Sequence, residues 1–346
     1  MKIIGIESSC DDTSVAIVNS ERNVLSNERV SQDNIHQLYK GVVPELAARN
    51  HVLHIDKITQ KALKKANLSL KDIDAVAATA GPGLIGGLLV GLSFAKTIAQ
   101  VKGIPFIAVN HLAGHALTAR LTENIDFPFL LLLISGGHSC FYFIEGLQSC
   151  TNLGGTLDDA VGEAFDKIAK ALNLKFPGGP EIEKAALVGD ENFFIFPKPL
   201  LNKNENNLDL SFSGLKSYII NLIKEKDRDL ISKNFIADTA ASFQKTVSDI
   251  LTTKLDRAIN LCNKKFPSFS NVVISGGVAS NCYLRNKFIS TVVSKNKIPI
   301  IPPAKLCTDN GAMIAWAGYE KYRLGLTNSL NFKALPRWPL ERLLYE

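Results

Sequence analysis

The 346-residue sequence lacks the features of secreted, membrane-spanning and disulfide-rich proteins. Its six cysteines are scattered and form no CxxC pair, so it predicts neither a disulfide framework nor a cysteine-rich zinc site. The longest strongly apolar run, Phe127–Ile134, is as long as a strand and too short to cross a bilayer. Glu7 interrupts the first apolar run, which argues against a secretory signal. We therefore expect a soluble cytoplasmic protein without membrane contacts.

Charge is scarce and unevenly distributed. Charged residues make up 21% of the chain and hydrophobic residues 46%, a composition that argues against intrinsic disorder. The segment 285–346 has ten Lys or Arg against four Asp or Glu and so carries the whole net charge of +6. Such a segment fits a polyanionic partner such as RNA, but a solvated surface without a partner explains the charge equally well.

The length predicts two lobes, because a single domain typically has about 100 to 200 residues. The periodicity of the first third predicts the order βββαβαβ, which is typical of a ribonuclease-H-like lobe. The predicted elements are strands at 2–7, 15–19 and from 24, a helix from 44, a strand at 73–79, a helix to about 101 and a strand at 105–110. We place this N-terminal lobe at 1–112.

A similar pattern begins again further along the chain. A strand predicted at 129–134 ends in ISGG and is followed by a strand at 141–144, and ISGG returns at 274–277 after another apolar segment. This repetition predicts an internal duplication. We place the second lobe at 113–310, with a helix around 246–261. A helix at about 311–325 is expected to pack back on the first lobe, before a tail at 326–346.

Three predicted strand ends lead into turns of small residues, at 7–14, 135–139 and 275–281. Unpaired backbone N–H groups point outward at such ends, and glycine lets a phosphate oxygen come close. One Ser-Gly-Gly turn alone is more often a plain turn, but three in a duplicated α/β chain favour a nucleotide site. Asp11, in the first turn, is either a residue that holds a cation or water beside the phosphates or an Asx-turn residue.

The glycine-rich loop Gly81–Gly87 lacks the Gly-Lys-Ser/Thr ending of a P-loop and the spacing of GxGxxG. We expect these glycines to let a helix pack closely on a strand. The strand turns are therefore the predicted nucleotide site.

His111 and His115 are candidate metal ligands. Four residues apart on a helical stretch, they would share one face with Cβ atoms about 5 to 6 Å apart. A zinc protease of the HExxH type needs a glutamate where this chain has Leu112, so a protease would lack its base. The other interpretation, one histidine capping the helix and the other a satisfied core residue, is equally compatible with the spacing.

Asp309 is the best candidate for a third ligand. Two histidines and one carboxylate suit Fe(II) with open positions and also zinc, and the donor set does not choose between the two metals. Because Asp309 precedes an apolar helix, an N-cap role is the alternative.

Taken in order, motifs along nearly the whole chain closely resemble the universal tRNA N6-adenosine threonylcarbamoyltransferase family, once called O-sialoglycoprotein endopeptidases. The matching segments are GIESSCDDT at 5–13, PELAAR at 44–49, AGPGL at 80–84, NHLAGH at 110–115, ISGGH at 134–138, DDAVGEAFDK at 158–167, PGGP at 177–180, FSGLK at 212–216, SGGVASN at 275–281 and CTDNGAMIA at 307–315.

The resemblance implies an actin-like fold of two duplicated ribonuclease-H-like lobes with a nucleotide cleft. It also implies a reaction, in which the threonylcarbamoyl group of threonylcarbamoyl-AMP passes to N6 of the adenosine 3′ of the anticodon, in tRNAs reading codons that begin with adenine. In bacteria the family works with a paralogous subunit of the same fold and a small P-loop ATPase. By family analogy, iron is bound by His111, His115 and Asp309, and the adenylate site is lined by Ile134, Ser135, Gly136, Gly137, His138, Asp166, Gly179, Glu183 and Asn281.

Other functions stay open: an ATPase or kinase on the same fold, a non-catalytic nucleotide-binding scaffold and a metalloprotease. The scaffold paralogue, by family resemblance, lacks the His-x-x-x-His and Asp set that this chain retains. A kinase would need a base aimed at a hydroxyl, and the sequence marks none. Asp11 is the candidate that we name for a catalytic role.

Overall fold

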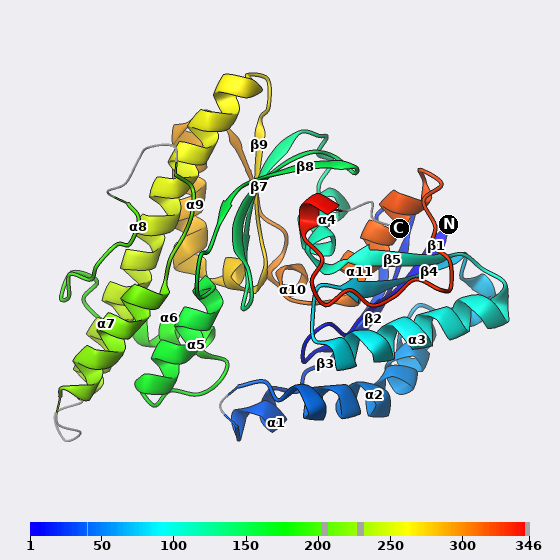
Figure 1. Cartoon of the computed structure of the whole chain (residues 1–346), viewed down its shortest axis with the longest axis horizontal. Coiled ribbons are helices and arrows are strands. Elements are labelled where there is room, and N and C mark those ends of the chain that lie inside the picture. Colours follow the sequence, from blue (N-terminus) through cyan, green and yellow to red (C-terminus); the bar gives the residue numbers. More distant parts are fainter. Residues whose placement is uncertain (40, 202–206, 227–231, 343–346) are drawn as a thin grey trace. The chain divides into compact units, whose positions relative to one another are not determined.

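The computed structural model of the protein describes residues 1–39, 41–201, 207–226 and 232–342 (Figure 1). Contacts divide it into two compact units. The first unit comprises Met1–Ile125, Gly146–Cys150 and Lys305–Glu346, and the second comprises Asp126–Glu145 and Thr151–Ala304.

The first unit is built on a five-stranded sheet with the strand order β3-β2-β1-β4-β5. Strand β1 pairs antiparallel with β2 and parallel with β4, and β4 pairs parallel with β5. The predicted order βββαβαβ is confirmed, although the fourth strand begins two residues later than expected. The strands are β1 (Lys2–Glu7), β2 (Thr13–Asn19), β3 (Val24–Val30), β4 (Ala75–Gly81) and β5 (Phe106–Asn110).

Helices lie on both faces of this sheet. On one face are α2 (Pro44–Lys65) and α3 (Ile85–Lys102), after the short α1 (Asp33–Gln37), and on the other are α11 (Gly311–Tyr322) and, beside it, α4 (His111–Thr122). Successive side chains of a strand point to opposite faces. Ile4 and Ile6 therefore belong to the core under α2 and α3, whereas Gly5 meets the backbone of α11. By the same alternation Glu7 points to the face with α11 and α4.

The contact division differs from the predicted lobe boundaries. Helix α4 belongs to the first unit, which continues to Ile125 rather than ending at 112, because α4 packs against α11 and β5. Residues 305–310 and α11 also belong to this unit. The predicted tail at 326–346 is not separate over its described part, because Trp338 is buried in the core and Leu335 N donates a hydrogen bond to Ala80 O. Residues 343–346 lie outside the described part.

The second unit repeats the same topology. Its sheet has the order β8-β7-β6-β9-β10, and β6 lies between antiparallel β7 and parallel β9, as β1 lies between β2 and β4. The predicted duplication is confirmed, and β6 coincides with the predicted strand at 129–134. The strands are β6 (Phe129–Ile134), β7 (Ser139–Gly146), β8 (Ser149–Gly155), β9 (Asn271–Ser275) and β10 (Ile298–Ile300).

Two long helices cover the face of β6 that carries Leu132 and Ile134. These are α8 (Lys233–Lys265), which begins with Ser232 as its N-cap, and α9 (Cys282–Ser294). Helix α8 has 33 residues, far more than the predicted 246–261, because its N-terminal half is held by tertiary packing of Phe235 and Phe243 despite a mixed polar sequence. The other helices of the unit are α5 (Val161–Ala171), α6 (Gly178–Ala186) and α7 (Ser213–Lys224), and α10 (Ala304–Cys307) follows α9.

Two expected absences can be compared with the structure. The six cysteines are free thiols. None of the described helices combines the length and the apolar composition needed to span a lipid bilayer.

Candidate functional site

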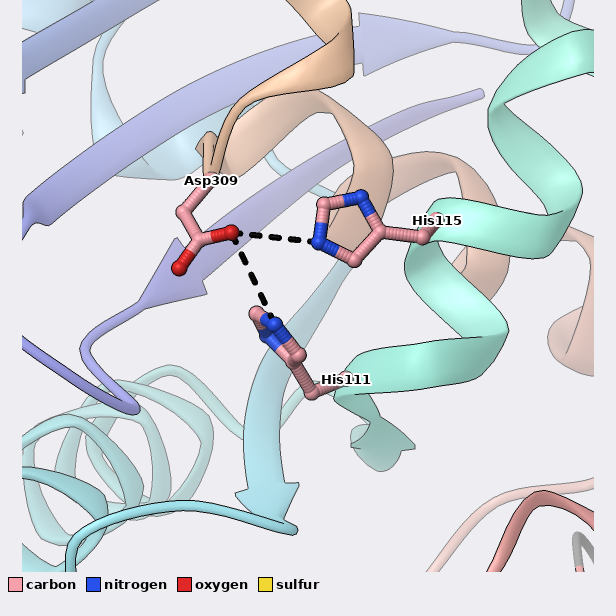
Figure 2. A group of neighbouring side chains, drawn as sticks. All are labelled: His111, His115 and Asp309. Atoms are coloured by element: carbon pink, nitrogen blue, oxygen red, sulfur yellow. Dashed lines mark hydrogen bonds and ion pairs between the residues drawn. The ribbon is translucent and has the colours of Figure 1, made fainter. Parts of the chain in front are cut away.

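His111, His115 and Asp309 lie together in the first unit (Figure 2). The histidines project from the first two turns of α4, and Asp309 comes just before α11. The Nε2 atoms of His115 and His111 are 3.1 Å and 3.6 Å from the same oxygen, Oδ1 of Asp309. Ligand atoms of the three residues all lie within 4.8 Å of one another. Both imidazoles therefore present one nitrogen to one carboxylate.

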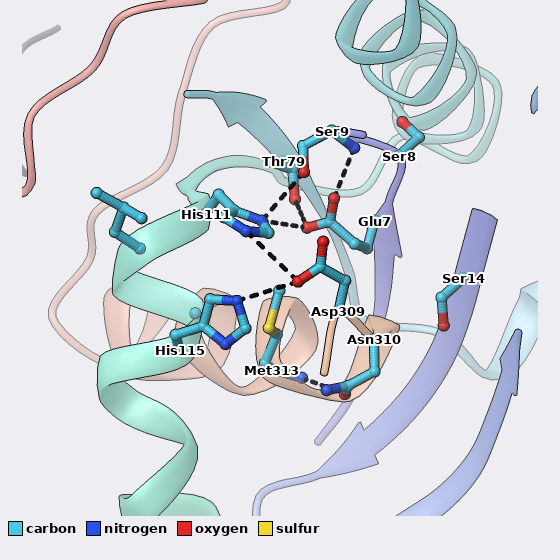
Figure 3. Close-up of polar contacts among 12 residues, drawn as sticks. Glu7, Ser8, Ser9, Ser14, Thr79, His111, His115, Asp309, Asn310 and Met313 are labelled. Carbon is cyan, nitrogen blue, oxygen red and sulfur yellow. Dashed lines mark hydrogen bonds and ion pairs between the residues drawn. The ribbon is translucent and has the colours of Figure 1, made fainter. Parts of the chain in front are cut away.

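Neighbouring asparagines cap the two helices that carry these residues. Asn110 Oδ1 accepts hydrogen bonds from the backbone N–H groups of Leu112 and Ala113, at 2.8 Å and 3.2 Å. Asn310 Oδ1 accepts one from Met313 N at 3.0 Å (Figure 3). The alternatives in which a histidine caps α4 and Asp309 caps α11 are therefore wrong, and His111 and Asp309 are available for the site.

Close packing of α11 on the sheet sets the position of Asp309. A Cβ atom on Gly5 would lie 2.3 Å from Ala315 N, and one on Gly311 would lie 2.5 Å from Ala16 N. The backbones of β1, β2 and α11 therefore approach each other more closely than side chains would allow. Ser14 Oγ also accepts a hydrogen bond from Gly311 N at 2.9 Å, which ties the first turn of α11 to β2.

Glu7, the last residue of β1, lies beside His111 and is 1% exposed (Figure 3). Its Oε2 is 3.0 Å from His111 Nδ1 and accepts a hydrogen bond from Thr79 Oγ1 at 2.6 Å, while its Oε1 accepts one from Ser9 N at 2.6 Å. Glu7 is not among the site residues predicted from the sequence. The signal that would have found it is a carboxylate ending a strand whose other residues are almost all apolar.

The buried charges of the site shift one another's pKa values. Burial alone lowers the pKa of His111, but the carboxylates of Asp309 and Glu7 outweigh it and raise the pKa to about 9. Burial also disfavours ionised Asp309, yet His111 and His115 hold the pKa of Asp309 far below its usual range. The buried carboxylate of Glu7 and the partly buried one of Asp309 thus favour positive charge beside them, which is the electrostatic condition of a cation site.

These residues fit a divalent metal. Two imidazole nitrogens and a carboxylate oxygen form a donor set that suits Fe(II) with open positions, and also zinc. The remaining ring nitrogen of His111 lies at hydrogen-bond distance from the Glu7 carboxylate, the arrangement that metal-bound histidines usually have.

Asp11 lies in the turn between β1 and β2 and outside the three-residue cluster. Burial raises its pKa and a hydrogen bond with Cys10 lowers it, but the nearby charge of Asp309 adds to the rise. His51 of α2 fixes this turn, because its ring nitrogens lie 3.1 Å from Cys10 O and 2.7 Å from Thr13 Oγ1. Since a carbonyl can only accept, Nε2 of His51 is the donor.

Two glycines of α3 support the same turn. A Cβ atom on Gly87 would lie 2.3 Å from Ser8 O, and one on Gly91 would lie 2.2 Å from Ser8 Oγ. Ser8 Oγ in turn donates a hydrogen bond to Gly87 O at 2.9 Å. The prediction that glycines of the loop Gly81–Gly87 serve close helix packing is confirmed for Gly87.

The second unit brings two of the predicted turns together. Strands β6 and β9 are parallel neighbours, so the turns that follow them lie at the same edge of the sheet. A Cβ atom on Gly276 would lie 2.3 Å from Ile134 O. The side chain of Ile134, predicted to line an adenylate site, is buried in the core under α8 and α9, so that its backbone alone faces the turns.

Hydrogen bonds join several of the other predicted adenylate residues to the helices beside them. Gly162 N at the start of α5 donates to Ser135 O at 3.2 Å, and His138 N donates to Ser135 Oγ at 3.1 Å. Asp166 is joined to the start of α6, Glu183 is joined to the start of α9, and Asn281 caps α9. The hydrogen bonds are Gly178 N to Asp166 Oδ1 at 2.7 Å, Cys282 N to Glu183 Oε1 at 2.7 Å, and Leu284 N to Asn281 Oδ1 at 2.9 Å.

Gly136, Gly137 and Gly179 differ from the glycines of the first unit. Gly136 and Gly137 are exposed and Gly179 is partly exposed, none of the three has a positive φ, and a Cβ atom on any of them would meet nothing within 4 Å. The packing of this chain therefore does not require glycine at these positions. Open space in front of backbone N–H groups is what a phosphate group needs.

Comparison with known proteins agrees with this geometry. The family model of tRNA N6-adenosine threonylcarbamoyltransferase matches residues 23–316, a range that contains the three clustered residues and the predicted adenylate residues. The tRNA N6-adenosine threonylcarbamoyltransferases of Rickettsia bellii (strain OSU 85-389) and Rickettsia rickettsii (strain Sheila Smith) are 52% and 51% identical over 343 residues. These alignments cover 99% of this chain and 99% and 98% of the relatives.

The chain belongs to this family. It is accordingly an enzyme of the transferase class, and the segments that carried the resemblance in the sequence fall within the matched range, apart from GIESSCDDT. GIESSCDDT lies wholly before residue 23 but within the 99% of the chain aligned with the relatives.

Solved structures show the fold of this family member. Component A of the (R)-2-hydroxyglutaryl-CoA dehydratase of Acidaminococcus fermentans matches with a TM-score of 0.52 and 16% identity, covering 93% of this chain and 99% of that one. HypF of T. kodakarensis matches with a TM-score of 0.60 and 16% identity, covering 94% of this chain and 48% of that one. Together with the duplicated sheets, these matches confirm the actin-like fold.

The basic segment 285–346 does not behave as one surface. Its described residues are divided between the two units. Several of its cations are also engaged inside a unit: Arg285 donates to Ala279 O and Pro302 O, Lys295 pairs with Asp256, and Lys321 donates to Ala108 O. Burial lowers the pKa of Lys321 to about 8. The charge count of this segment thus overstates what it offers to an anionic partner.

Proposed function

We propose that this transferase moves the threonylcarbamoyl group of threonylcarbamoyl-AMP to N6 of adenosine 37, 3′ of the anticodon, in tRNAs that read codons beginning with adenine, and releases AMP. Family membership over nearly the whole chain supports this proposal. The observation that carries it is the cluster in which His111 and His115 share one oxygen of Asp309.

The chemistry asks mainly for positioning. The donor is a mixed carbamic–phosphoric anhydride and is already activated. The exocyclic amine attacks the carbamoyl carbon, a C–N bond forms, the C–O bond to phosphate breaks, and the amine loses a proton. Asp11 is our candidate acceptor for that proton, because burial raises its pKa and makes it a better base than an exposed aspartate.

The metal in this proposal is Fe(II), with zinc as the alternative, held by Nε2 of His111 and His115 and by the carboxylate of Asp309. When bound it supplies a Lewis acid for a carbamoyl or phosphate oxygen. Glu7 and Ser9 hold His111 through its other ring nitrogen, at 3.0 Å and 3.2 Å.

The adenylate in this proposal lies at the turns of the second unit. The open space at Gly136, Gly137 and Gly179 supports a phosphate there. Asp166, Glu183 and Asn281 hold the ends of α6 and α9 next to those turns. Ser135 and His138 complete the first turn through their mutual hydrogen bonds.

The proposed partners are tRNA, a paralogous subunit of the actin-like fold and a small P-loop ATPase, in the cytoplasm. Exposed cations such as Lys287, Lys305 and Arg337 are available for tRNA. Binding through them predicts an affinity that falls steeply with salt.

Transfer can be tested by mixing the purified protein and its partners with labelled threonylcarbamoyl-AMP and a tRNA reading an adenine-initial codon. Label should reach adenosine 37, and a matched tRNA reading another codon class should stay unlabelled. His111→Ala should lose both metal and transfer, whereas His54→Ala, a partly buried histidine of α2, should keep both. No labelled adenosine with all partners present, or full transfer by His111→Ala, would contradict the proposal.

A further inference from the structure

Glu7 is a buried carboxylate that contacts His111 and takes no part in the bond changes of the proposed reaction. It is 1% exposed at the end of β1, and its pairs with charged side chains in the described chain involve His111 and no lysine or arginine. An ionised carboxylate that is buried without a lysine or arginine beside it needs hydrogen bonds to both of its oxygens. Without them its burial lowers the stability of the folded protein. Glu28, another buried glutamate of the same sheet, instead pairs with two lysines, Lys61 and Lys65.

The partners of Glu7 determine which atom donates in each contact. Oε1 accepts from Ser9 N, a backbone group that can only donate. Oε2 accepts from Thr79 Oγ1 and faces His111 Nδ1 at 3.0 Å. Because a carboxylate can only accept, the contact with Nδ1 requires a proton on that nitrogen.

A proton on Nδ1 leaves Nε2 as the nitrogen with a lone pair for a metal. Nε2 of His111 is the atom that faces Asp309 Oδ1, at 3.6 Å, beside Nε2 of His115. The ring orientation that Glu7 holds is therefore the one that aims Nε2 into the cluster.

We propose that Glu7 is a positioning residue of the metal site, which fixes the ring orientation and the protonated nitrogen of His111 so that Nε2 binds the metal. The proposal rests on the metal site of the proposed function. It follows that a neutral side chain of the same shape at this position should weaken metal binding, although it fills the same space.

Glu7→Gln is the sharpest variant. The amide oxygen must face Ser9 N–H, which cannot turn away, so the NH2 group takes the place of Oε2. This group donates to His111 Nδ1, and the ring proton must then move to Nε2, where it competes with the metal. Glu28→Gln is the matched control, since it is the same change at a buried glutamate of the same sheet, with no contact to His111.

Two measurements test the proposal. Zinc affinity is measured on folded protein by competition with a chromophoric chelator, and should fall about 10- to 100-fold in Glu7→Gln while Glu28→Gln stays within about threefold of wild type. Long-range 1H–15N NMR of the zinc-loaded wild type, with 15N-labelled histidine, should show Nδ1 of His111 protonated and Nε2 bound. The second measurement decides the question even where Glu7→Gln does not fold.

Three outcomes would overturn the proposal. Zinc on Nδ1 of His111 in the wild type excludes the assigned geometry. Wild-type zinc affinity in folded Glu7→Gln, even with lowered thermal stability, reduces Glu7 to a structural residue and leaves the metal site intact. A wild type that binds no zinc or Fe(II) removes the metal site itself, and the role of Glu7 with it.

Discussion

The two units share one strand order but hold their corresponding carboxylates in different ways. Glu7 and Ile134 each end the central strand, and each lies opposite a serine of the next strand, Ser14 or Ser139. Each serine hydroxyl accepts a hydrogen bond, at 2.9 Å, from the first N–H of a helix, which is α11 in one unit and α5 in the other. The two duplicated units thus share individual hydrogen bonds as well as their topology.

The carboxylates two residues before those helices show the divergence. Asp309 precedes α11 and faces two histidines, whereas Asp159 precedes α5 and contacts Lys167, at 3.5 Å, and Lys216. Lysines neutralise Asp159 permanently, so it has no need of a cation. Histidines can give up their protons to a metal, and they leave Asp309 as a ligand. One scaffold position therefore serves an ion pair in one unit and a candidate metal site in the other.

The largest expected effect is the difference between substitutions of Asp309 and Asp159. Asp309→Asn should lower metal affinity by at least about 100-fold. The effect should exceed that of Glu7→Gln, because Asp309 is a proposed ligand of the metal whereas Glu7 only positions one. Asp159→Asn should leave the metal content unchanged and lower stability. Metal content by mass spectrometry and zinc competition measure both. Equal metal loss in the two variants would mean that the carboxylates have not diverged.

The second prediction compares glycines. Gly87→Ala places a Cβ atom 2.3 Å from Ser8 O and should destabilise the protein by about 1 to 3 kcal/mol. Gly136→Ala meets nothing within 4 Å, so stability should change by no more than about 0.5 kcal/mol, while AMP affinity falls. Chemical denaturation and AMP titration separate the two effects. Unchanged AMP binding in Gly136→Ala would argue against a phosphate at this turn.

The third prediction concerns the two serines. Ser14→Ala and Ser139→Ala each remove the acceptor of a helix's first N–H, and each should cost about 1 kcal/mol of unfolding free energy. Denaturant midpoints of the two variants against wild type give the values. Markedly different costs would show that the shared geometry does not carry a shared energetic role.

The smallest expected effect is a dependence of stability on acid in the second unit. Burial alone would raise the pKa of Asp158, but hydrogen bonds from Ser211, Phe212 N and Ser213 lower it to about 2. A lowered pKa in the folded state stabilises above the unfolded value of 3.8, and this contribution is lost as pH falls from about 4 through 2. Asp158→Asn should flatten the stability profile in that window, as measured by thermal melts from pH 5 to pH 2. A stability profile that stays as steep as that of the wild type would mean that groups other than Asp158 cause the acid sensitivity.

Local patterns predicted much of this molecule. The strand predicted at 129–134 coincides with β6. The apolar run between Pro128 and a Ser-Gly-Gly turn is as long as a strand and too short for a typical helix. Helix α8 was predicted at half its length, because its polar N-terminal half is helical through tertiary packing rather than through its own periodicity. The roles of the nine adenylate residues stay a prediction.

By itself the sequence determined the order of strands and helices along the first lobe and the placement of His111 and His115 on one face of a helix, because these depend on residues within a few positions of one another. Only the tertiary structure decided that Asp309, 194 residues after His115, meets the histidines, and that Glu7 lies behind them. The physical reason is the packing of α11 against β1, where Gly5 and Gly311 let the backbones approach. The spacing of residues along the chain does not predict a contact between residues that are so far apart in the sequence.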